Sequence, residues 1–444
     1  MPTVYLETYG CQMNVADSEM VLGLLDRAGY ERASDPAAAD VILINTCAVR
    51  ERAVERVLGR ASSLAQHKAN RRQVIIGITG CMAKHLGGDL LRQAPYVDLV
   101  VGPDGYRRLP EHIERARSGE RVLDTELDPQ ETYEGLDSSR ATSSAVIGHV
   151  AIQRGCDRFC SFCVVPYTRG RERATPPGEV VRQVRVLAAC GCREVQLLGQ
   201  TVNSYRFTEG KQDIGFAELL QRVAAINGID RIRFISPYPL GFTPEVIATM
   251  AELPEVCKHV HLPLQSASDT VLARMKRGYT FAQYRTLVEQ LRSAMPDIAI
   301  TTDFLVGFCG ESEAEYDETL AALTTLRFDN AFMFAYSVRA GTAAARDLPD
   351  DVPAEVKQRR LARVIEEQRQ ITAQSYSGRV GRHERVLLES PSRRSPAELL
   401  GRTDGFRPVI VQRGPRVDVG GLVDVIIERS GPGTLYGRAS EEGP

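Results

Sequence analysis

The chain has 444 residues, which is enough for two or three domains, each with its own hydrophobic core. Its 55 Lys and Arg residues are balanced by 57 Asp and Glu residues, which excludes a basic surface over the whole chain and confines any nucleic-acid site to a local patch. No apolar run reaches the roughly 18 residues of a membrane helix, the first residues lack a secretion signal, and the ten cysteines are too spread out for a disulfide framework. We therefore expect a cytoplasmic protein with no membrane segment.

In the first 123 residues, short apolar runs alternate with segments of helical periodicity. The expected strands are residues 3–7, 41–44, 74–78 and 97–101, and the expected helices are residues 15–28, 50–66 and 83–93. This alternation predicts a Rossmann-like parallel α/β domain with crossover helices.

One cysteine follows each of the first three strands: Cys11, Cys47 and Cys81. Because the carboxyl ends of parallel strands share one edge of the sheet, these residues should converge there, beside helix N-termini that favour an anionic group. The pattern predicts metal ligands that hold an iron–sulfur cluster. The alternative is that each is a small buried residue at a strand end, which explains one such cysteine more readily than three.

Cys156, Cys160 and Cys163 follow the next apolar run, residues 150–152, at CxxxCxxC spacing. A closed zinc site needs four protein ligands and disulfides need pairs, so three adjacent thiolates favour an iron–sulfur cluster with one iron left open for catalysis. The alternative is an incomplete zinc knuckle or a chance grouping, although closely spaced cysteines in an intracellular chain usually bind metal or react.

Six apolar runs between residues 150 and 335 alternate with helical segments and predict a partial (βα)6 barrel. The expected strands are 150–152, 194–198, 231–235, 259–264, 299–304 and 328–335, and the expected helices are 216–225, 244–252, 281–294 and 313–326. At the carboxyl ends of these strands, the side chains of Gln200, Asn203 and Gln265 and the backbone of Gly307 would contact a ligand. Turn formation explains each of these positions equally well.

Two further groups of residues lie near the candidate sites. Arg169, Arg171 and Arg173 follow the cysteine loop and form either a solvated charged face or a phosphate-binding site. Of the remaining cysteines only Cys309 lies at a strand end, near the expected cofactor, and we expect none of the four to bind metal: Cys190, Cys192, Cys257 and Cys309.

The C-terminal region changes pattern. Residues 354–376 have the spacing of an amphipathic helix that caps the barrel. Beyond residue 378, Gly and Pro separate short β-prone runs (385–388, 398–401, 408–412, 422–427 and 434–439), which predicts a small antiparallel β-barrel rich in Arg and suited to RNA. The expected division is an N-terminal domain (1–123), a linker (124–144), a central barrel (145–375) and a C-terminal RNA-binding barrel (376–441).

Six segments together resemble the radical S-adenosylmethionine (SAM) methylthiotransferases of the MiaB type. They are TYGCQMNVADSE from Thr8, NTCAVRE from Asn45, GCMAK from Gly80, GCDRFCSFCVVPYTRGRER from Gly155, LLGQTVNSY from Leu197 and HLPLQSASD from His261. The resemblance covers the whole chain and implies an N-terminal methylthiotransferase domain, a radical SAM core and a C-terminal TRAM domain. The chain departs from the usual GFPGE, YSPRPGT and PLQSGS segments at Cys309, Val338, Ala340 and Ala267, and it keeps every cluster cysteine.

The resemblance implies two 4Fe-4S clusters and SAM as cofactors. Cys156, Cys160 and Cys163 would be the catalytic ligands of the cluster that cleaves SAM, and Cys11, Cys47 and Cys81 would hold the auxiliary cluster that carries sulfur. Phe162 would lie near the adenine of SAM, and the other expected cofactor contacts are Gln200, Asn203, Gln265, Gly307 and Glu311.

The activity that the resemblance implies is methylthiolation of tRNA. N6-isopentenyladenosine on the 3′ side of the anticodon would become 2-methylthio-N6-isopentenyladenosine, with one SAM cleaved to a 5′-deoxyadenosyl radical and a second SAM donating the methyl group. The expected partners are the tRNA anticodon arm, an electron donor such as flavodoxin or ferredoxin, and a sulfur source or cluster-assembly carrier. We expect a monomer.

Two other activities stay open. Methylthiolation of a ribosomal-protein aspartate is the runner-up within the same chemistry. An iron–sulfur protein that binds RNA or transfers electrons without SAM chemistry would explain the cysteines and the small barrel, but not the open iron or the GQTVNS and VGFCGE loops.

Overall fold

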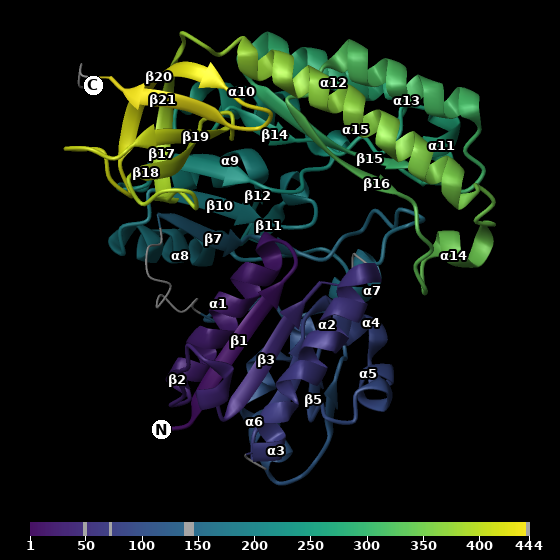
Figure 1. Cartoon of the computed structure of the whole chain (residues 1–444), viewed down its shortest axis with the longest axis vertical. Helices are drawn as coiled ribbons and strands as arrows, with labels where there is room; N and C mark the ends of the chain where they lie inside the picture. Colours follow the sequence, from purple (N-terminus) through teal and green to yellow (C-terminus); the bar gives the residue numbers. More distant parts are fainter. Residues whose placement is uncertain (48–50, 71–72, 137–145, 441–444) are drawn as a thin grey trace.

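The computed structural model describes residues 1–47, 51–70, 73–136 and 146–440, which form an N-terminal α/β domain, a central barrel and a C-terminal β-barrel (Figure 1). Residues 48–50 of the second cysteine segment, 137–144 of the expected linker and 441 of the expected C-terminal domain lie outside this range. None of the helices in the described part combines the length and apolarity that a membrane crossing requires.

The N-terminal domain contains a six-stranded, fully parallel sheet in the order β2-β1-β3-β4-β5-β6. The strands are β1 (Thr3–Tyr9), β2 (Glu31–Arg32), β3 (Val41–Thr46), β4 (Ile75–Thr79), β5 (Leu99–Val101) and β6 (Val122–Asp124). The helices are α1 (Gln12–Arg27), α2 (Glu51–Leu64), α3 (Gln66–Asn70), α4 (Cys81–Leu86), α5 (Gly88–Gln93) and α6 (Leu109–Arg117). Apolar clusters cover both faces of the sheet, which explains why β3 is buried along its whole length.

The predicted parallel sheet is therefore confirmed, with three differences in detail. The expected helix over residues 83–93 is two short helices, because Gly87 adopts a φ of +51° between them. Strands β2 and β6 are too short to give an alternating pattern and were not expected. Asp124, at the start of the expected linker, is the last residue of β6, and Tyr133 and Leu136 pack into the domain core.

The central domain is a split parallel barrel built from two three-stranded halves, β13-β10-β7 and β14-β15-β16. The strands are β7 (Ile147–Ala151), β10 (Glu194–Leu198), β13 (Arg231–Phe234), β14 (His259–His261), β15 (Ala299–Val306) and β16 (Asn330–Ala335). The halves meet at the bridge between Ile232 and Val256, and β7 and β16 are the outer strands. The predicted partial barrel, open on one side between β7 and β16, is confirmed.

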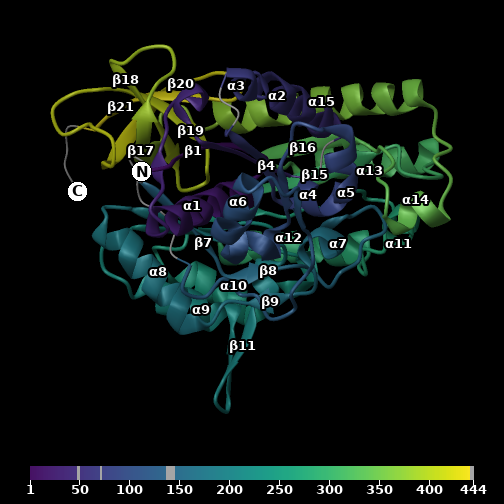
Figure 2. The same ribbon diagram turned by 90° about the horizontal axis from the view of Figure 1, so that it is seen from below.

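Helices cover the outside of this barrel. They are α8 (Pro177–Ala189), α9 (Phe216–Ala224), α10 (Pro244–Glu252), α11 (Asp269–Arg274), α12 (Phe281–Ala294), α13 (Glu313–Leu326) and α15 (Ala354–Ser377). The short α14 (Ala343–Asp347) contacts the loop of Cys156, Cys160 and Cys163 instead. The long α15 lies along β16 and α13, as Figure 1 shows in green. A hairpin of β11 (Arg206–Glu209) and β12 (Gln212–Gly215) projects from the domain (Figure 2) and was not expected.

The C-terminal domain is a closed five-stranded barrel in the order β17-β18-β19-β21-β20. Its strands are β17 (His383–Pro391), β18 (Glu398–Thr403), β19 (Pro408–Gln412), β20 (Leu422–Ser430) and β21 (Leu435–Ala439). The predicted small barrel is confirmed, and its ladders are antiparallel except for the parallel pair of β19 and β21. Arg231 and Arg233 of β13 fix it to the central domain by donating to the backbone oxygens of Arg402 and Thr403 at 2.7 and 2.8 Å.

Candidate functional site

The loop that carries Cys156, Cys160 and Cys163 starts after the short strand β8 (Gln153–Arg154) and ends at α7 (Val165–Arg169). Gly155 begins the loop with a φ of +76°, and a Cβ there would lie 2.0 Å from the Arg171 oxygen, so only glycine fits. The Cys156 N–H donates to the Gly170 oxygen at 3.1 Å, which closes the loop on itself.

The three thiols of this loop lie close together and largely away from water. Cys156 and Cys160 are buried and Cys163 is partly buried. Burial, reinforced by the neighbouring thiols, raises the pKa of Cys156 to about 11 and that of Cys163 to about 12. The buried Arg277 donates from Nη1 to the Cys160 sulfur at 3.2 Å. This set of donors fits an iron–sulfur cluster. Without iron the Cys156 and Cys163 thiols keep their protons, which iron would displace, and the positive charge of Arg277 would offset the negative charge of the resulting thiolates.

Most expected cofactor contacts at the strand ends also hold the loops together. Gln200 accepts from the Gly155 N–H at 2.6 Å. Asn203 donates to the Tyr238 oxygen at 2.8 Å and accepts from the Tyr238 N–H at 2.7 Å. Gln265 has a φ of +74°, and its backbone bonds to β15. Loop formation therefore accounts for the polar groups of Asn203, and the assignment of these residues to SAM stays a prediction.

The remaining expected contacts lie in the loop after β15. The Gly307 N–H donates to Glu311 Oε2 at 2.6 Å, and the same carboxylate pairs with Arg360 of α15 at 2.8 Å. Burial raises the pKa of Glu311. Phe162 packs edge-on against Phe308, with ring centroids 6.3 Å apart, and thereby joins the cysteine loop to this loop.

The second trio of cysteines lies where the N-terminal domain meets the barrel. Cys11 caps the N-terminus of α1, Cys47 follows β3 and Cys81 is the first residue of α4. All three line one cavity of about 160 Å3. The barrel completes its wall with residues from α7 and from the ends of β10 and β13, namely Val164, Val165, Thr168, Arg169, Leu198, Gly199, Gln200, Ile235 and Ser236.

The electrostatics of this cavity favour an anionic group. Cys47 stabilises the Cys11 thiolate by a hydrogen bond, and with Arg169 it lowers the pKa of Cys11 to about 6. Burial raises the pKa of Cys81, whose sulfur accepts from Arg169 Nε at 3.1 Å. Three thiols around a space of this size, with a cation beside them, fit a second iron–sulfur cluster.

No three His, Cys, Asp or Glu side chains converge on a single metal ion within the described ranges. Cysteines that hold a cluster ligate different iron atoms, so they surround a volume and need not converge on one point. Of the other cysteines, Cys192, Cys257 and Cys309 are buried and Cys190 is exposed.

A buried ion-pair network joins the two cysteine sites. Asp17 of α1 is fully buried and pairs with Arg169 Nη2 at 2.7 Å and with Arg154 Nη1 at 3.1 Å. Arg173 similarly pairs with Asp104 of the N-terminal domain at 2.9 Å. The solvated-face interpretation is therefore wrong for Arg169 and Arg173, whose side chains are buried and connect domains, and only Arg171 is exposed. Phosphate binding by these arginines stays a prediction.

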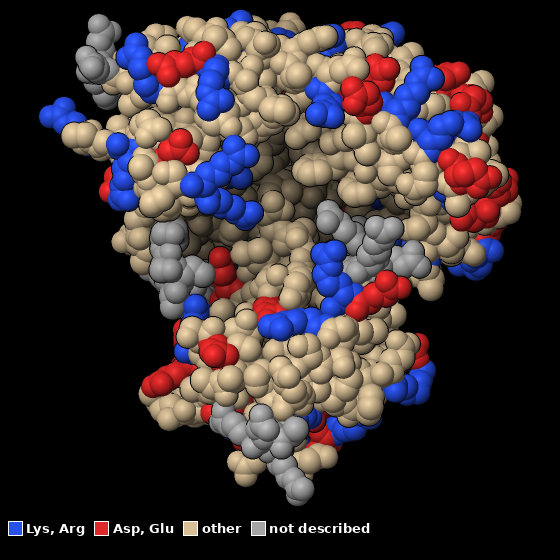
Figure 3. Space-filling model, in the orientation of Figure 1, with Lys and Arg blue, Asp and Glu red and all other residues tan. Residues whose placement is uncertain are grey.

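The inner face of the barrel beside its open edge carries aromatic and polar side chains. Phe332 and Phe334 of β16 are 55% and 40% exposed, whereas Ala331 and Met333 point to the covered outer face. Phe332 lies opposite Asp303 in the sheet, and Asp303 contacts His261 at 3.2 Å. Figure 3 shows a hollow between the N-terminal domain and the two other domains, with Lys and Arg atoms at its rim.

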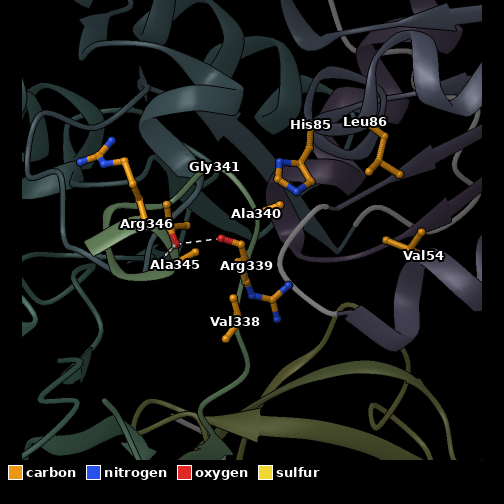
Figure 4. A pocket seen from close by; sticks show the side chains of 10 residues that line it. Val54, His85, Leu86, Val338, Arg339, Ala340, Gly341, Ala345 and Arg346 are labelled. Atoms are coloured by element: carbon orange, nitrogen blue, oxygen red, sulfur yellow. Dashed lines mark hydrogen bonds between the residues drawn. The ribbon is translucent and has the colours of Figure 1, made fainter. Parts of the chain in front are cut away.

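A larger cavity of about 740 Å3 lies between the N-terminal domain and the segment after β16 (Figure 4). His85 and Leu86 line one wall, and Val338, Arg339 and Ala340 line the other. The departures at positions 338 and 340 therefore face a cavity between domains. The segment that follows this wall contacts the loop of Cys156, Cys160 and Cys163, since the Ala344 N–H donates to the Ser161 oxygen at 2.7 Å.

Comparisons with known proteins agree with this arrangement. Residues 3–102 match a family described as uncharacterized protein family UPF0004, residues 150–323 match the radical SAM superfamily and residues 378–439 match the TRAM domain. The solved structure of the radical SAM methyltransferase TsrM from Kitasatospora setae, with tryptophan and a SAM analog bound, superposes with a TM-score of 0.57. The two chains are 15% identical, and the superposition covers 78% of this chain and 75% of the TsrM chain, which shows a shared fold.

Much closer similarity is found to curated sequences. A protein of Chlorobium limicola named tRNA-2-methylthio-N(6)-dimethylallyladenosine synthase is 45% identical over 98% of each chain. A protein of Porphyromonas gingivalis with the same name is 44% identical over 99% of this chain and 95% of its own. The chain therefore belongs to the radical SAM methylthiotransferase family, in the branch named tRNA-2-methylthio-N(6)-dimethylallyladenosine synthase.

Proposed function

We propose that the protein methylthiolates tRNA by converting N6-isopentenyladenosine, on the 3′ side of the anticodon, to 2-methylthio-N6-isopentenyladenosine. The observation that carries this proposal is that Val164, directly after Cys163 of one cysteine trio, packs against Cys81 of the other across a domain interface. The chain also shares 45% identity with a synthase over nearly its whole length. The TRAM domain, fixed to the barrel by Arg231 and Arg233, supports an RNA substrate.

The cofactors are two 4Fe-4S clusters and SAM. Cys156, Cys160 and Cys163 would hold the first cluster, and the trio of Cys11, Cys47 and Cys81 would hold the auxiliary cluster. When bound, the first cluster would supply the electron for reductive cleavage of SAM and so the radical chemistry at C-2 of the adenine, and the auxiliary cluster would supply sulfur for methylation by a second SAM.

The chain's own residues orient these groups and keep water out. Arg277 places a positive charge beside Cys160, and Asp17 holds Arg154 and Arg169 so that the two sites keep a fixed separation. Phe332 and Phe334 offer apolar and stacking surface for an adenine that leaves the anticodon loop, as single-stranded bases do when proteins bind them. The isopentenyl group is apolar and would gain from the same surface.

Several finer assignments belong to this proposal. Phe162, Gln200, Asn203, Gln265, Gly307 and Glu311 are proposed around SAM, directly or by holding its loops. The proposed domain division at residues 144 and 375 is compatible with the family matches at 150–323 and 378–439, whereas the N-terminal core includes Tyr133 and Leu136 and so extends beyond the expected end at residue 123. An electron donor such as flavodoxin or ferredoxin, a sulfur source, a monomeric state and a cytoplasmic location complete the proposal.

A comparison of two cysteine variants tests the division of labour between the sites. Cys156→Ala should abolish 5′-deoxyadenosine formation from SAM under reducing conditions. Cys81→Ala should still form 5′-deoxyadenosine but no methylthio nucleoside. Equal loss of both products in Cys81→Ala would contradict the proposal, and product on a ribosomal-protein aspartate instead of tRNA would favour the runner-up.

A further inference from the structure

Arg169 has one nitrogen whose role the fold does not explain. This residue ends α7 and lines the cavity of Cys11, Cys47 and Cys81. Its Nε donates to the Cys81 sulfur at 3.1 Å and its Nη2 to Asp17 at 2.7 Å. Its Nη1 is buried and has no hydrogen-bond partner in the described part of the chain.

A buried N–H group without a partner is costly, and native proteins rarely leave one without a ligand or water to accept from it. The Arg169 side chain is only 4% exposed, so bulk water does not meet this need. The described lining of the cavity contains no carboxylate, and apart from the cysteines it is made largely of apolar groups such as Met13, Leu198 and Ile235. Apart from the cysteine thiols, the described lining holds no anionic group, so an anionic acceptor inside the cavity would compete for Arg169 only with those thiols and with Asp17, which already pairs with Nη2.

We propose that Arg169 is a positioning residue for the sulfur that the auxiliary site carries. Its Nη1 donates to a sulfide bound in the cavity, while its Nε holds Cys81 and its Nη2 stays with Asp17. This inference rests on the proposed function and adds to it the residue that holds the sulfur.

The geometry of arginine explains why this residue type is suited to the role. The guanidinium presents donors in one rigid plane and can serve Cys81, Asp17 and a third group at once, whereas lysine is a single point charge on a flexible stem. A cation that donates to cluster sulfur stabilises the more negative, reduced state and so raises the reduction potential.

The position of Arg169 in α7 separates its role from that of the SAM-binding loop. The helix starts at Val165, whose N–H lies 3.5 Å from the Cys163 sulfur, and ends at Arg169 beside Cys81. A change confined to the end of the Arg169 side chain leaves the contact at Cys163 in place.

The test uses the full chain with Cys156, Cys160 and Cys163 replaced by Ala, so that only the auxiliary cluster is present. Arg169→Gln removes the charge and leaves one donor nitrogen in place of three, and Arg169→Lys keeps the charge that pairs with Asp17. Arg171→Gln is the matched control, because Arg171 is in the same segment but its side chain is 70% exposed and pairs with Asp157. For each protein one measures iron content, the reduction potential by electron paramagnetic resonance, and the affinity for added sodium sulfide from the change in that spectrum.

Arg169→Gln should shift the potential to more negative values and weaken sulfide binding by about 10- to 100-fold, as loss of an outer contact to a metal site typically does. Arg169→Lys should keep a full iron content and weaken sulfide binding by a smaller factor, and Arg171→Gln should match the parent. Unchanged potential and sulfide affinity in an iron-loaded Arg169→Gln would overturn the inference. If Arg169→Gln does not retain iron, the test rests on Arg169→Lys. A reduction potential and a sulfide affinity equal to those of the parent in Arg169→Lys would then overturn the inference.

The measurement contains no tRNA and no SAM, so it is independent of the substrate. A negative result removes the role of Arg169 and leaves the proposed methylthiolation standing. Failure of the tRNA assay would remove the proposed function without changing this result.

Discussion

Asp17→Asn should loosen the contact between the N-terminal domain and the barrel, because Asp17 is the buried anion shared by Arg154 and Arg169. Asn has one acceptor oxygen, so one charge-assisted hydrogen bond is lost, at about 1.5–3 kcal/mol. In the remaining bond the charged arginine donates to a neutral amide oxygen instead of a carboxylate, which weakens the bond and adds about 1 kcal/mol. The total of about 3 kcal/mol lies at the lower end of the range for removing one partner of a buried ion pair, about 3–5 kcal/mol.

Hydrogen exchange of the metal-free chain measures this loss at α7. The Tyr167 and Thr168 amides donate to the Val164 oxygen at 3.0 and 3.1 Å and should exchange about 100-fold faster in Asp17→Asn, which corresponds to about 3 kcal/mol. Asp213→Asn is the control, because its pair with Arg206 at 2.7 Å is exposed and should contribute at most about 1 kcal/mol. Similar exchange rates in Asp17→Asn and Asp213→Asn would refute the reasoning.

Two further changes test the contact between the central barrel and the C-terminal barrel and the inner face of the central barrel. Burial holds the pKa of His259 well below 6.5, with Arg233, His261 and Arg407 nearby, so the folded chain loses stability as the pH falls below 6.5, by up to about 1.4 kcal/mol per unit. Urea unfolding at about pH 7 and pH 5.5 should show that His259→Phe loses this dependence, and equal pH slopes would contradict it. Phe334→Ala should reduce the preference for isopentenylated over unmodified anticodon stem-loop RNA by about 10-fold in a binding titration, since about 1–2 kcal/mol of apolar contact is lost. Equal loss of affinity for both RNAs would show that Phe334 does not read the isopentenyl group.

The strands and most helices of the barrel could be predicted from the sequence because short β-prone runs alternate with segments of helical periodicity. The helices over residues 244–252, 281–294 and 313–326 have the expected bounds. Cys11, Cys47 and Cys81 were expected at one edge of a sheet from topology alone, and they line one cavity.

The ion pairs between the domains could not be predicted in this way. Asp17 and its partners Arg154 and Arg169 are 137 and 152 positions apart, and no local pattern reports a contact over such a distance. The sequence does contain one sign of such an ion pair. Asp17 lies four residues from both Met13 and Val21, so its charge falls on the buried, apolar face of α1. A charge in that position requires a partner from another element.

The role of Arg277 was also missed. It lies 114 residues after Cys163 in a segment that resembles an ordinary turn, and only the fold brings its Nη1 to within 3.2 Å of the Cys160 sulfur. The same limit explains why Arg173 could not be distinguished from an RNA contact, since its partner Asp104 is 69 positions away.

The most direct test of the account is an anaerobic assay of the reconstituted protein with dithionite, SAM and tRNA that contains isopentenyladenosine. Mass spectrometry should detect both 5′-deoxyadenosine and 2-methylthio-N6-isopentenyladenosine. Formation of 5′-deoxyadenosine without the modified nucleoside would contradict the assigned substrate, and absence of both from a protein that holds both clusters would contradict the assigned chemistry.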